Sequence, residues 1–105
     1  MRTELGKYHG EYIVVTCKVK KIIKKNGFTN LLFVDTKKGD EILTDHFWMA
    51  AINVKNKAMI KELEVGKTYR LRGKVYIYKK ISKIDGTRTV PDYNFKGIKI
   101  ISEEV

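Results

Sequence analysis

The sequence predicts an all-β domain of five strands, with one short helix between the third and the fourth strand. Three observations support this fold class. Apolar and polar residues alternate with a period of two over several long stretches, as they do in strands that bury one face. Turn residues such as Asn26-Gly27 separate these stretches. The period changes to three or four residues only after Ile52 and returns to two at Lys67, which confines the helix to that interval.

The first three strands are expected to form a meander with short turns. Alternation over residues 12–23 predicts the first strand, and Asn26-Gly27 favours a tight hairpin because both residues tolerate positive φ. The second strand follows over 29–35. Lys37-Lys38-Gly39-Asp40 is expected to turn the chain into a third strand over 41–50. The inward face of the first strand is expected to hold Ile13, Val15, Cys17 and Val19.

The helix is expected near residues 53–63, because apolar residues there recur every three or four positions and Asn53 or Asn56 can act as a cap. The fourth strand, over 67–80, has the most regular alternation in the chain. Its inward side chains are Tyr69, Leu71, Gly73, Val75 and Ile77, and its outward ones are Arg70, Arg72, Lys74, Tyr76, Tyr78 and Lys80. The tail over 87–101 predicts a last strand that is interrupted at Pro91.

This order of elements predicts a five-stranded Greek-key barrel of the OB type, formed by one domain over residues 1–105. The passage Leu63-Glu64-Val65-Gly66-Lys67-Thr68-Tyr69-Arg70-Leu71-Arg72-Gly73-Lys74-Val75 resembles the helix end, glycine and fourth strand common in OB-fold domains. Leu43-Thr44-Asp45-His46-Phe47-Trp48 is similar to small OB-like proteins of bacteriophages and related mobile elements. An SH3-like barrel and a split barrel remain alternatives, because element order does not determine strand pairing.

The charge balance predicts a polyanionic partner. The chain has 105 residues, with 22 Lys and Arg against 12 Asp and Glu, and its formal net charge is +10. Residues 12–34 and 65–84 contain no acidic residue. An alternative explanation of the lysine content is an AT-rich genome, which places lysine at any surface position. The positions of the charges must therefore distinguish a polyanionic partner from this compositional bias.

The outward face of the fourth strand is the strongest functional signal, because cations and tyrosines alternate on it. Cations bind phosphates and aromatic rings stack on bases, so this pattern is typical of a surface for single-stranded nucleic acid. Basic loops near Lys24 and Lys83 are expected to flank it. The candidate nucleic-acid-binding residues are Lys18, Lys20, Lys24, Lys25, Phe28, Trp48, Arg70, Arg72, Lys74, Tyr76, Tyr78, Lys80, Lys83, Arg88 and Tyr93.

Several aromatic residues have two interpretations. Phe28 is either an exposed loop tip or the first core residue of the second strand. Trp48 is expected to lie outside with Thr44 and His46, although reversed faces would place it in the core. Tyr93 and Phe95 serve either as stacking platforms or as a lid packed on the sheet.

Catalytic and metal chemistry is not expected. Asp45 and His46 are adjacent on a strand, so strict alternation sends them to opposite faces, where they cannot bind one ion. We find no phosphate loop, paired-carboxylate motif or Cys/His nucleophile in the sequence, and we expect no enzyme, cofactor or small-molecule substrate. The single cysteine, Cys17, is expected to be a buried apolar residue. With no signal peptide or membrane span in the sequence, we expect a cytoplasmic protein.

The predicted function is sequence-tolerant binding of single-stranded DNA, in replication, recombination or repair of a phage or mobile element. Single-stranded RNA is a close variant, and a homo-oligomer is left open. The alternative function is a protein-interaction module that presents its basic face to an acidic partner protein.

Overall fold

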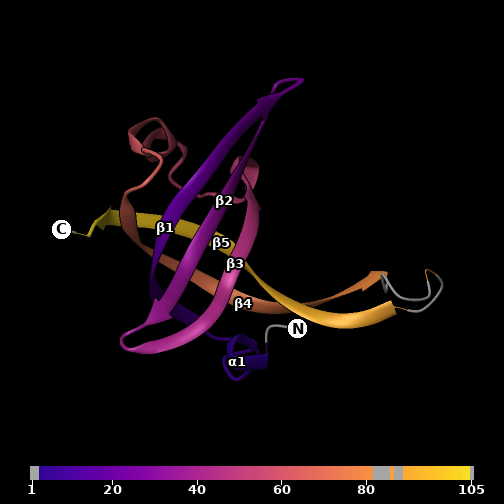
Figure 1. The fold of residues 1–105 in the computed structure, drawn as a ribbon. Helices are drawn as coiled ribbons and strands as arrows, with labels where there is room; N and C mark the ends of the chain where they lie inside the picture. Colours follow the sequence, from indigo (N-terminus) through magenta and orange to yellow (C-terminus); the bar gives the residue numbers. More distant parts are fainter. Residues whose placement is uncertain (1–2, 82–85, 87–88, 105) are drawn as a thin grey trace.

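The computed structural model describes residues 3–81, 86 and 89–104, which form one antiparallel sheet of five strands in the order β3-β2-β1-β4-β5 (Figure 1). The strands are β1 (Tyr12–Lys25), β2 (Phe28–Lys38), β3 (Glu41–Ala50), β4 (Thr68–Ile81) and β5 (Thr89–Glu103). The long strand β1 pairs with β4 from Tyr12 to Lys18 and with β2 from Thr16 to Lys25. The predicted fold class of five strands in a mainly β chain is confirmed.

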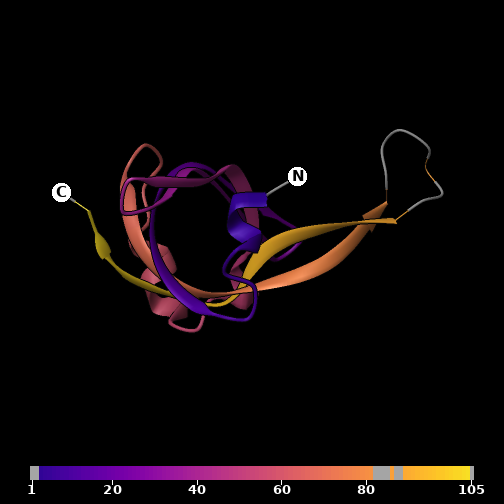
Figure 2. The same cartoon turned by 90° about the horizontal axis from the view of Figure 1, so that it is seen from below.

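The sheet curls strongly (Figure 2) but stays open, because β3 and β5 are its two edges and do not pair as strands. The predicted barrel is therefore not confirmed. The segment after β3 bonds to the edge of β5 instead: Val54 forms a parallel bridge with Ile98, and the Lys55 amide donates to the Ile98 carbonyl at 2.7 Å. The Asn56 side chain donates to the Ile100 carbonyl at 2.7 Å and accepts from the Ile100 amide at 2.9 Å.

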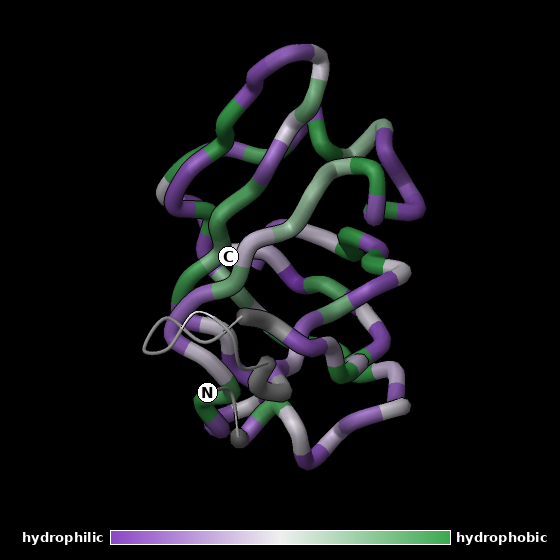
Figure 3. Tube along the Cα trace, turned by 90° about the vertical axis from the view of Figure 1, so that its right-hand side faces the viewer, coloured by the Kyte–Doolittle hydropathy of each residue, from purple (hydrophilic) through white to green (hydrophobic). Residues whose placement is uncertain are grey.

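The core lies inside the curl and includes the inward side chains predicted for β1 and β4, except that Ile77 is exposed. The strands β2, β3 and β5 supply most of its other side chains. Hydrophobic and hydrophilic stretches are interleaved along the trace (Figure 3), and in β1 buried and more exposed positions alternate from Tyr12 to Lys20. Phe47 packs against Phe33 and Phe95, with ring centres 5.1 Å apart in both pairs. Cys17 is buried as predicted, and burial raises the pKa of its thiol.

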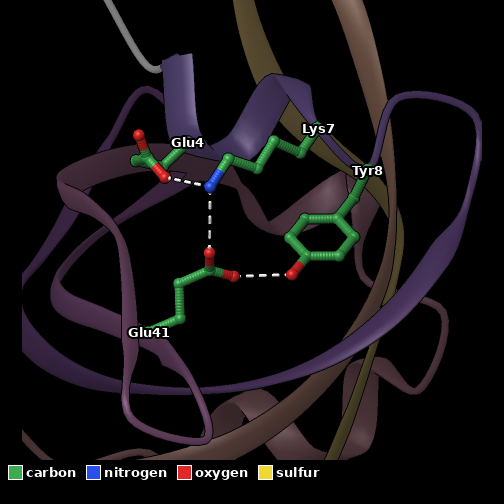
Figure 4. Close-up of polar contacts among 4 residues, drawn as sticks. All are labelled: Glu4, Lys7, Tyr8 and Glu41. Carbon is green, nitrogen blue, oxygen red and sulfur yellow. Dashed lines mark hydrogen bonds and ion pairs between the residues drawn. The ribbon is translucent and has the colours of Figure 1, made fainter.

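A short N-terminal helix, α1 (Thr3–Gly6), was not predicted. Its Leu5 side chain is fully buried in the core. Lys7 and Tyr8, just after the helix, bind the Glu41 carboxylate at the start of β3 (Figure 4). The nitrogen of Lys7 lies 3.2 Å from one Glu41 oxygen and 2.5 Å from Glu4, while the Tyr8 hydroxyl donates to the other Glu41 oxygen at 2.5 Å. These contacts attach the N-terminal segment to the β2–β3 turn.

The predicted helix between β3 and β4 is present as two 3₁₀ turns, η1 (Ala51–Asn53) and η2 (Lys57–Glu62). Asn56 is the N-cap residue of η2, as predicted, but its side chain forms no capping hydrogen bond because it bonds to the Ile100 backbone. The Tyr69 hydroxyl fixes the exit from η2: it accepts from the Glu64 amide at 2.8 Å and donates to the Glu62 carbonyl at 3.2 Å.

The first turn agrees with the sequence, whereas the second turn and the last strand differ from it. Asn26 and Gly27 both have positive φ, 53° and 78°, as the predicted hairpin requires. The next turn consists of Gly39-Asp40 alone, since β2 extends to Lys38. The predicted interruption at Pro91 is wrong: β5 continues through it, and an edge strand tolerates a residue without an amide proton.

Candidate functional site

The outer face of β4 meets the start of β1 in a cluster of cations around one tyrosine. Tyr12 pairs across the strands with Lys74, and its neighbour Val14 pairs with Arg72. The guanidinium carbon of Arg72 lies 4.3 Å from the centre of the Tyr12 ring. The ammonium groups of Lys55 and Lys74 lie 5.7 Å and 5.9 Å from the same centre. We call these four residues, Tyr12, Lys55, Arg72 and Lys74, the Tyr12 cluster.

A glycine opposite the cluster makes room for Lys55. Gly97 on β5 has φ of 59°, a left-handed conformation that side chains rarely adopt. A Cβ atom at this position would lie 3.2 Å from Cε of Lys55 and 3.8 Å from the Tyr12 hydroxyl. The absence of a side chain at Gly97 therefore lets Lys55 reach the ring from beyond the edge of the sheet.

The Tyr12 cluster carries uncompensated positive charge. Among the described residues, no carboxylate forms an ion pair with Lys55, Arg72 or Lys74. Other basic residues do have acidic partners: Arg70 lies 3.0 Å from Glu104, and Lys67 contacts Glu64 and Glu103. The predicted binding residue Arg70 thus points outward, but a carboxylate partly neutralises it.

Tyr76 and Tyr78 continue the outer face of β4 beyond the cluster. Their ring centres lie 5.9 Å apart at 41°, and the ammonium group of Lys96 lies 5.4 Å from the Tyr76 ring. Both side chains are half-buried, and the Tyr78 hydroxyl donates to Asp92 at 3.3 Å. The structure therefore brings together the predicted residues Arg72, Lys74, Tyr76 and Tyr78 on one ribbon.

Trp48 lies on the outer face of β3 with 43% of its side chain exposed, as predicted. Asn94 connects it to the tyrosines: this residue pairs with Tyr76 across β4 and β5, and its side-chain amide donates to the Trp48 carbonyl at 3.2 Å. The hydrogen bond crosses the open edge between β5 and β3. Trp48 thus sits across that edge from the aromatic end of β4.

The predicted residues of β1 lie in two further places. Lys18 and Lys20 are exposed and line an open groove of about 610 Å³ with Asp45 and His46. Lys24 and Lys25 are exposed at the end of the β1–β2 hairpin. Phe28 beside them is the first residue of β2 and is 68% exposed, so it is not a core residue.

The remaining predicted residues do not join these groups. The Tyr93 ring meets His9 edge-on at 6.1 Å, and a Cβ atom on Gly6 would clash with it at 2.7 Å, so Tyr93 packs as a lid over the N-terminal segment. Phe95 is core. Lys80 lies in β4, but its side chain is outside what the structure describes, and Lys83 and Arg88 fall outside the described residues.

The prediction that Asp45 and His46 point to opposite faces is wrong. Nδ1 of His46 lies 2.9 Å from a carboxylate oxygen of Asp45, and this hydrogen bond lowers the pKa of Asp45. Alternation fails near two irregularities of the β2–β3 pair: Asp35, between the paired residues Val34 and Thr36, has a positive φ of 53°, and the register shifts between Thr36 and Lys37. Thr44 consequently turns inward, and Asp45 points outward with His46.

No metal site appears in the part of the chain that the structure describes, where no three His, Cys, Asp or Glu side chains gather suitably for an ion. Over the same residues, no helix is long and apolar enough to cross a membrane. Comparisons with protein-family models, curated proteins and solved structures find no match to this chain.

Sequence reasoning missed Tyr12, Lys55 and Lys96 as site residues. Tyr12 was on the predicted outer face of the first strand, and its aromatic ring at the start of an alternating, acid-free stretch was a signal that pointed to it. Lys55 and Lys96 gave no such signal. Both reach tyrosine rings through contacts between segments distant in sequence.

Proposed function

We propose that this chain is an OB-type domain that binds single-stranded nucleic acid, with single-stranded DNA as the ligand. The strand order supports the fold, because a Greek key places its fourth strand beside the first, in the order 4-1-2-3. The chain has this order, read as β3-β2-β1-β4, with β5 beyond β4. OB domains are partly open Greek-key barrels, which fits a curled sheet whose open edge is bridged by residues 54–56.

The observation that carries the functional proposal is the Tyr12 cluster. Three cations lie within 6 Å of one ring centre, and no described carboxylate pairs with them. Like charges this close repel one another. A phosphate backbone would relieve that repulsion and replace small counterions, and the release of those counterions favours binding.

Aromatic rings beside the cluster offer a second kind of contact with a single strand, which is stacking on its bases. Tyr76, Tyr78 and Trp48 are at least partly exposed on the outer face of the sheet. A ring stacks on the flat face of a base, and these faces are accessible only when the strand is unpaired. Because neither rings nor phosphate-binding cations read base edges, we expect binding that tolerates sequence changes.

Fluorescence anisotropy with labelled oligothymidylate and a duplex of equal length, over a salt series, tests the proposal. We expect the single strand to bind at least about tenfold more tightly than the duplex. Three phosphates neutralised at the Tyr12 cluster predict a log-log salt slope of about −2. Equal affinity for duplex, or affinity independent of salt, would contradict the proposal. Failure to bind any oligonucleotide would favour the alternative of an acidic protein partner.

A further inference from the structure

A groove at the end of the β1–β2 hairpin lies at the opposite end of β1 from Tyr12, and it is lined in part by Lys24, Lys25 and Phe28, which the sequence predicted to bind nucleic acid. It has a volume of about 730 Å³ and lies between the hairpin end and the η1–η2 segment. Phe28 and Ile52 line it, and they are the two most exposed large apolar side chains among the described residues, at 68% and 71%. Large apolar side chains that share one exposed groove are typical of interaction sites.

A second hollow continues the groove along η2. The two share Thr29, Ala51, Lys57 and Ile60, and the second adds Ile22 and Leu63 to an aliphatic floor. Together they form one apolar channel, which we call the hairpin groove. Half-buried Ile60 links its two parts.

The rim of the hairpin groove is positively charged. Lys24, Lys25, Lys57 and Lys61 line it, and no acidic residue does so. In the described part of the chain, no carboxylate forms an ion pair with any of these lysines. The groove therefore offers apolar contacts in its floor and unpaired cations around them.

We propose that the hairpin groove binds an acidic peptide segment of a partner protein, one whose carboxylates flank two or more large apolar side chains. The rim lysines pair with the carboxylates, and the channel takes the apolar side chains. The floor favours a peptide over nucleic acid, because it is built from isoleucine and leucine with one aromatic ring, Phe28, whereas bases bind through stacked rings.

This site differs from the proposed nucleic-acid surface. Tyr12 and Lys25 are the first and last residues of β1, so the ring of the Tyr12 cluster and the hairpin end lie at opposite ends of this strand. Variants at the two sites can therefore separate the two proposals.

Selection of a random dodecapeptide phage library on the wild-type protein tests this inference. Phages that also bind the double variant Phe28→Ser/Ile52→Ser are removed at each round. We expect enriched peptides rich in Asp and Glu with at least two large apolar residues. As synthetic labelled peptides they should bind the double variant, and separately Lys57→Glu/Lys61→Glu, at least about tenfold more weakly than wild type.

Controls distinguish this proposal from the nucleic-acid function. Circular dichroism and thermal unfolding show that the variants are folded, and Arg72→Gln should keep its peptide affinity. Oligothymidylate affinity should be unchanged in the single variant Ile52→Ser, because Ile52 lines the groove and is not a predicted nucleic-acid-binding residue. No enrichment, enriched peptides without acidic character, or loss of oligonucleotide binding in Ile52→Ser would each overturn the inference. Peptide binding at the hairpin groove would support this inference even if the wild-type protein bound no oligonucleotide.

Discussion

The guanidinium group of Arg72 lies over the ring of Tyr12, with its carbon 4.3 Å from the ring centre. This contact joins the outer faces of β4 and β1, and two lysines share the same ring. A cation over a tyrosine is held by the electrons of the ring, so it stays in place without a carboxylate partner. The Tyr12 ring therefore holds the guanidinium group of Arg72 in place and leaves it free to bind a phosphate.

Gly97→Ala tests how Lys55 reaches the Tyr12 cluster. The change forces alanine into a φ of 59° and brings its Cβ within 3.2 Å of Lys55. We expect a loss of about 1 kcal/mol in unfolding free energy and weaker oligonucleotide binding. Gly10→Ala is the control, because Gly10 also has positive φ but has open space around it. Equal loss of binding in both variants would contradict a specific role for the space beside Lys55.

Asn56→Ala tests the bridge between residues 54–56 and β5. The variant loses both hydrogen bonds to the Ile100 backbone and leaves that edge without these partners. We expect a loss of about 1–3 kcal/mol in unfolding free energy, measured by urea denaturation. Asn53→Ala is the matched control, because Asn53 is exposed and has no recorded side-chain hydrogen bond. Similar losses in the two variants would mean that Asn56 does not hold the edge.

We expect the stability of the N-terminal segment to depend on pH through the Glu41 carboxyl group. Hydrogen bonds from Tyr8 and Lys7 lower the pKa of its carboxyl group below the usual value, which is about 4.3. Because the folded-state pKa is lowered, this stabilisation is present above about pH 4.3 and is lost as the pH falls through the folded-state pKa. In Tyr8→Phe, carbon-detected NMR titration should show the Glu41 pKa moving back toward its usual value. An unchanged pKa would show that Tyr8 does not stabilise the ionised form.

Trp48 predicts a direct optical signal. It is the only tryptophan in the chain and its ring is partly exposed beside the open edge. Stacking on a base should quench its fluorescence when oligothymidylate binds, with the same midpoint as the anisotropy change. Trp48→Phe should weaken binding only modestly, because an aromatic ring remains. Unchanged emission during full binding would exclude Trp48 from the contact surface.

The strands were predictable because their signals are local. Alternation identified β1 and β4 almost to the residue, and turn residues identified the Asn26-Gly27 hairpin and the start of β3. Alternation failed where the backbone departs from it. The inward phase of β2 and β3 changes near Asp35, which has a left-handed conformation, and near the register shift between Thr36 and Lys37. The signal in the sequence was Asp45, a charged residue among the inward positions of β3.

The candidate site was only half predictable, for a related reason. The outward face of β4 follows from its own sequence, but pairing between distant strands decides which neighbours its side chains meet. The same non-local pairing joined Arg70 to Glu104, Arg72 to Tyr12 and Asn94 to Trp48. Helix α1 was missed because its single anchor, Leu5, creates no periodic pattern.

The most direct test of the nucleic-acid proposal compares Arg72→Gln with Lys61→Gln in oligothymidylate titrations over a salt series. Both side chains are exposed, both variants lose one positive charge, and neither residue has an ion-pair partner among the described residues. We predict that Arg72→Gln binds about five- to tenfold more weakly and loses about 0.7 from the salt slope, while Lys61→Gln stays close to wild type. Equal effects of the two variants would contradict a binding surface centred on the Tyr12 cluster.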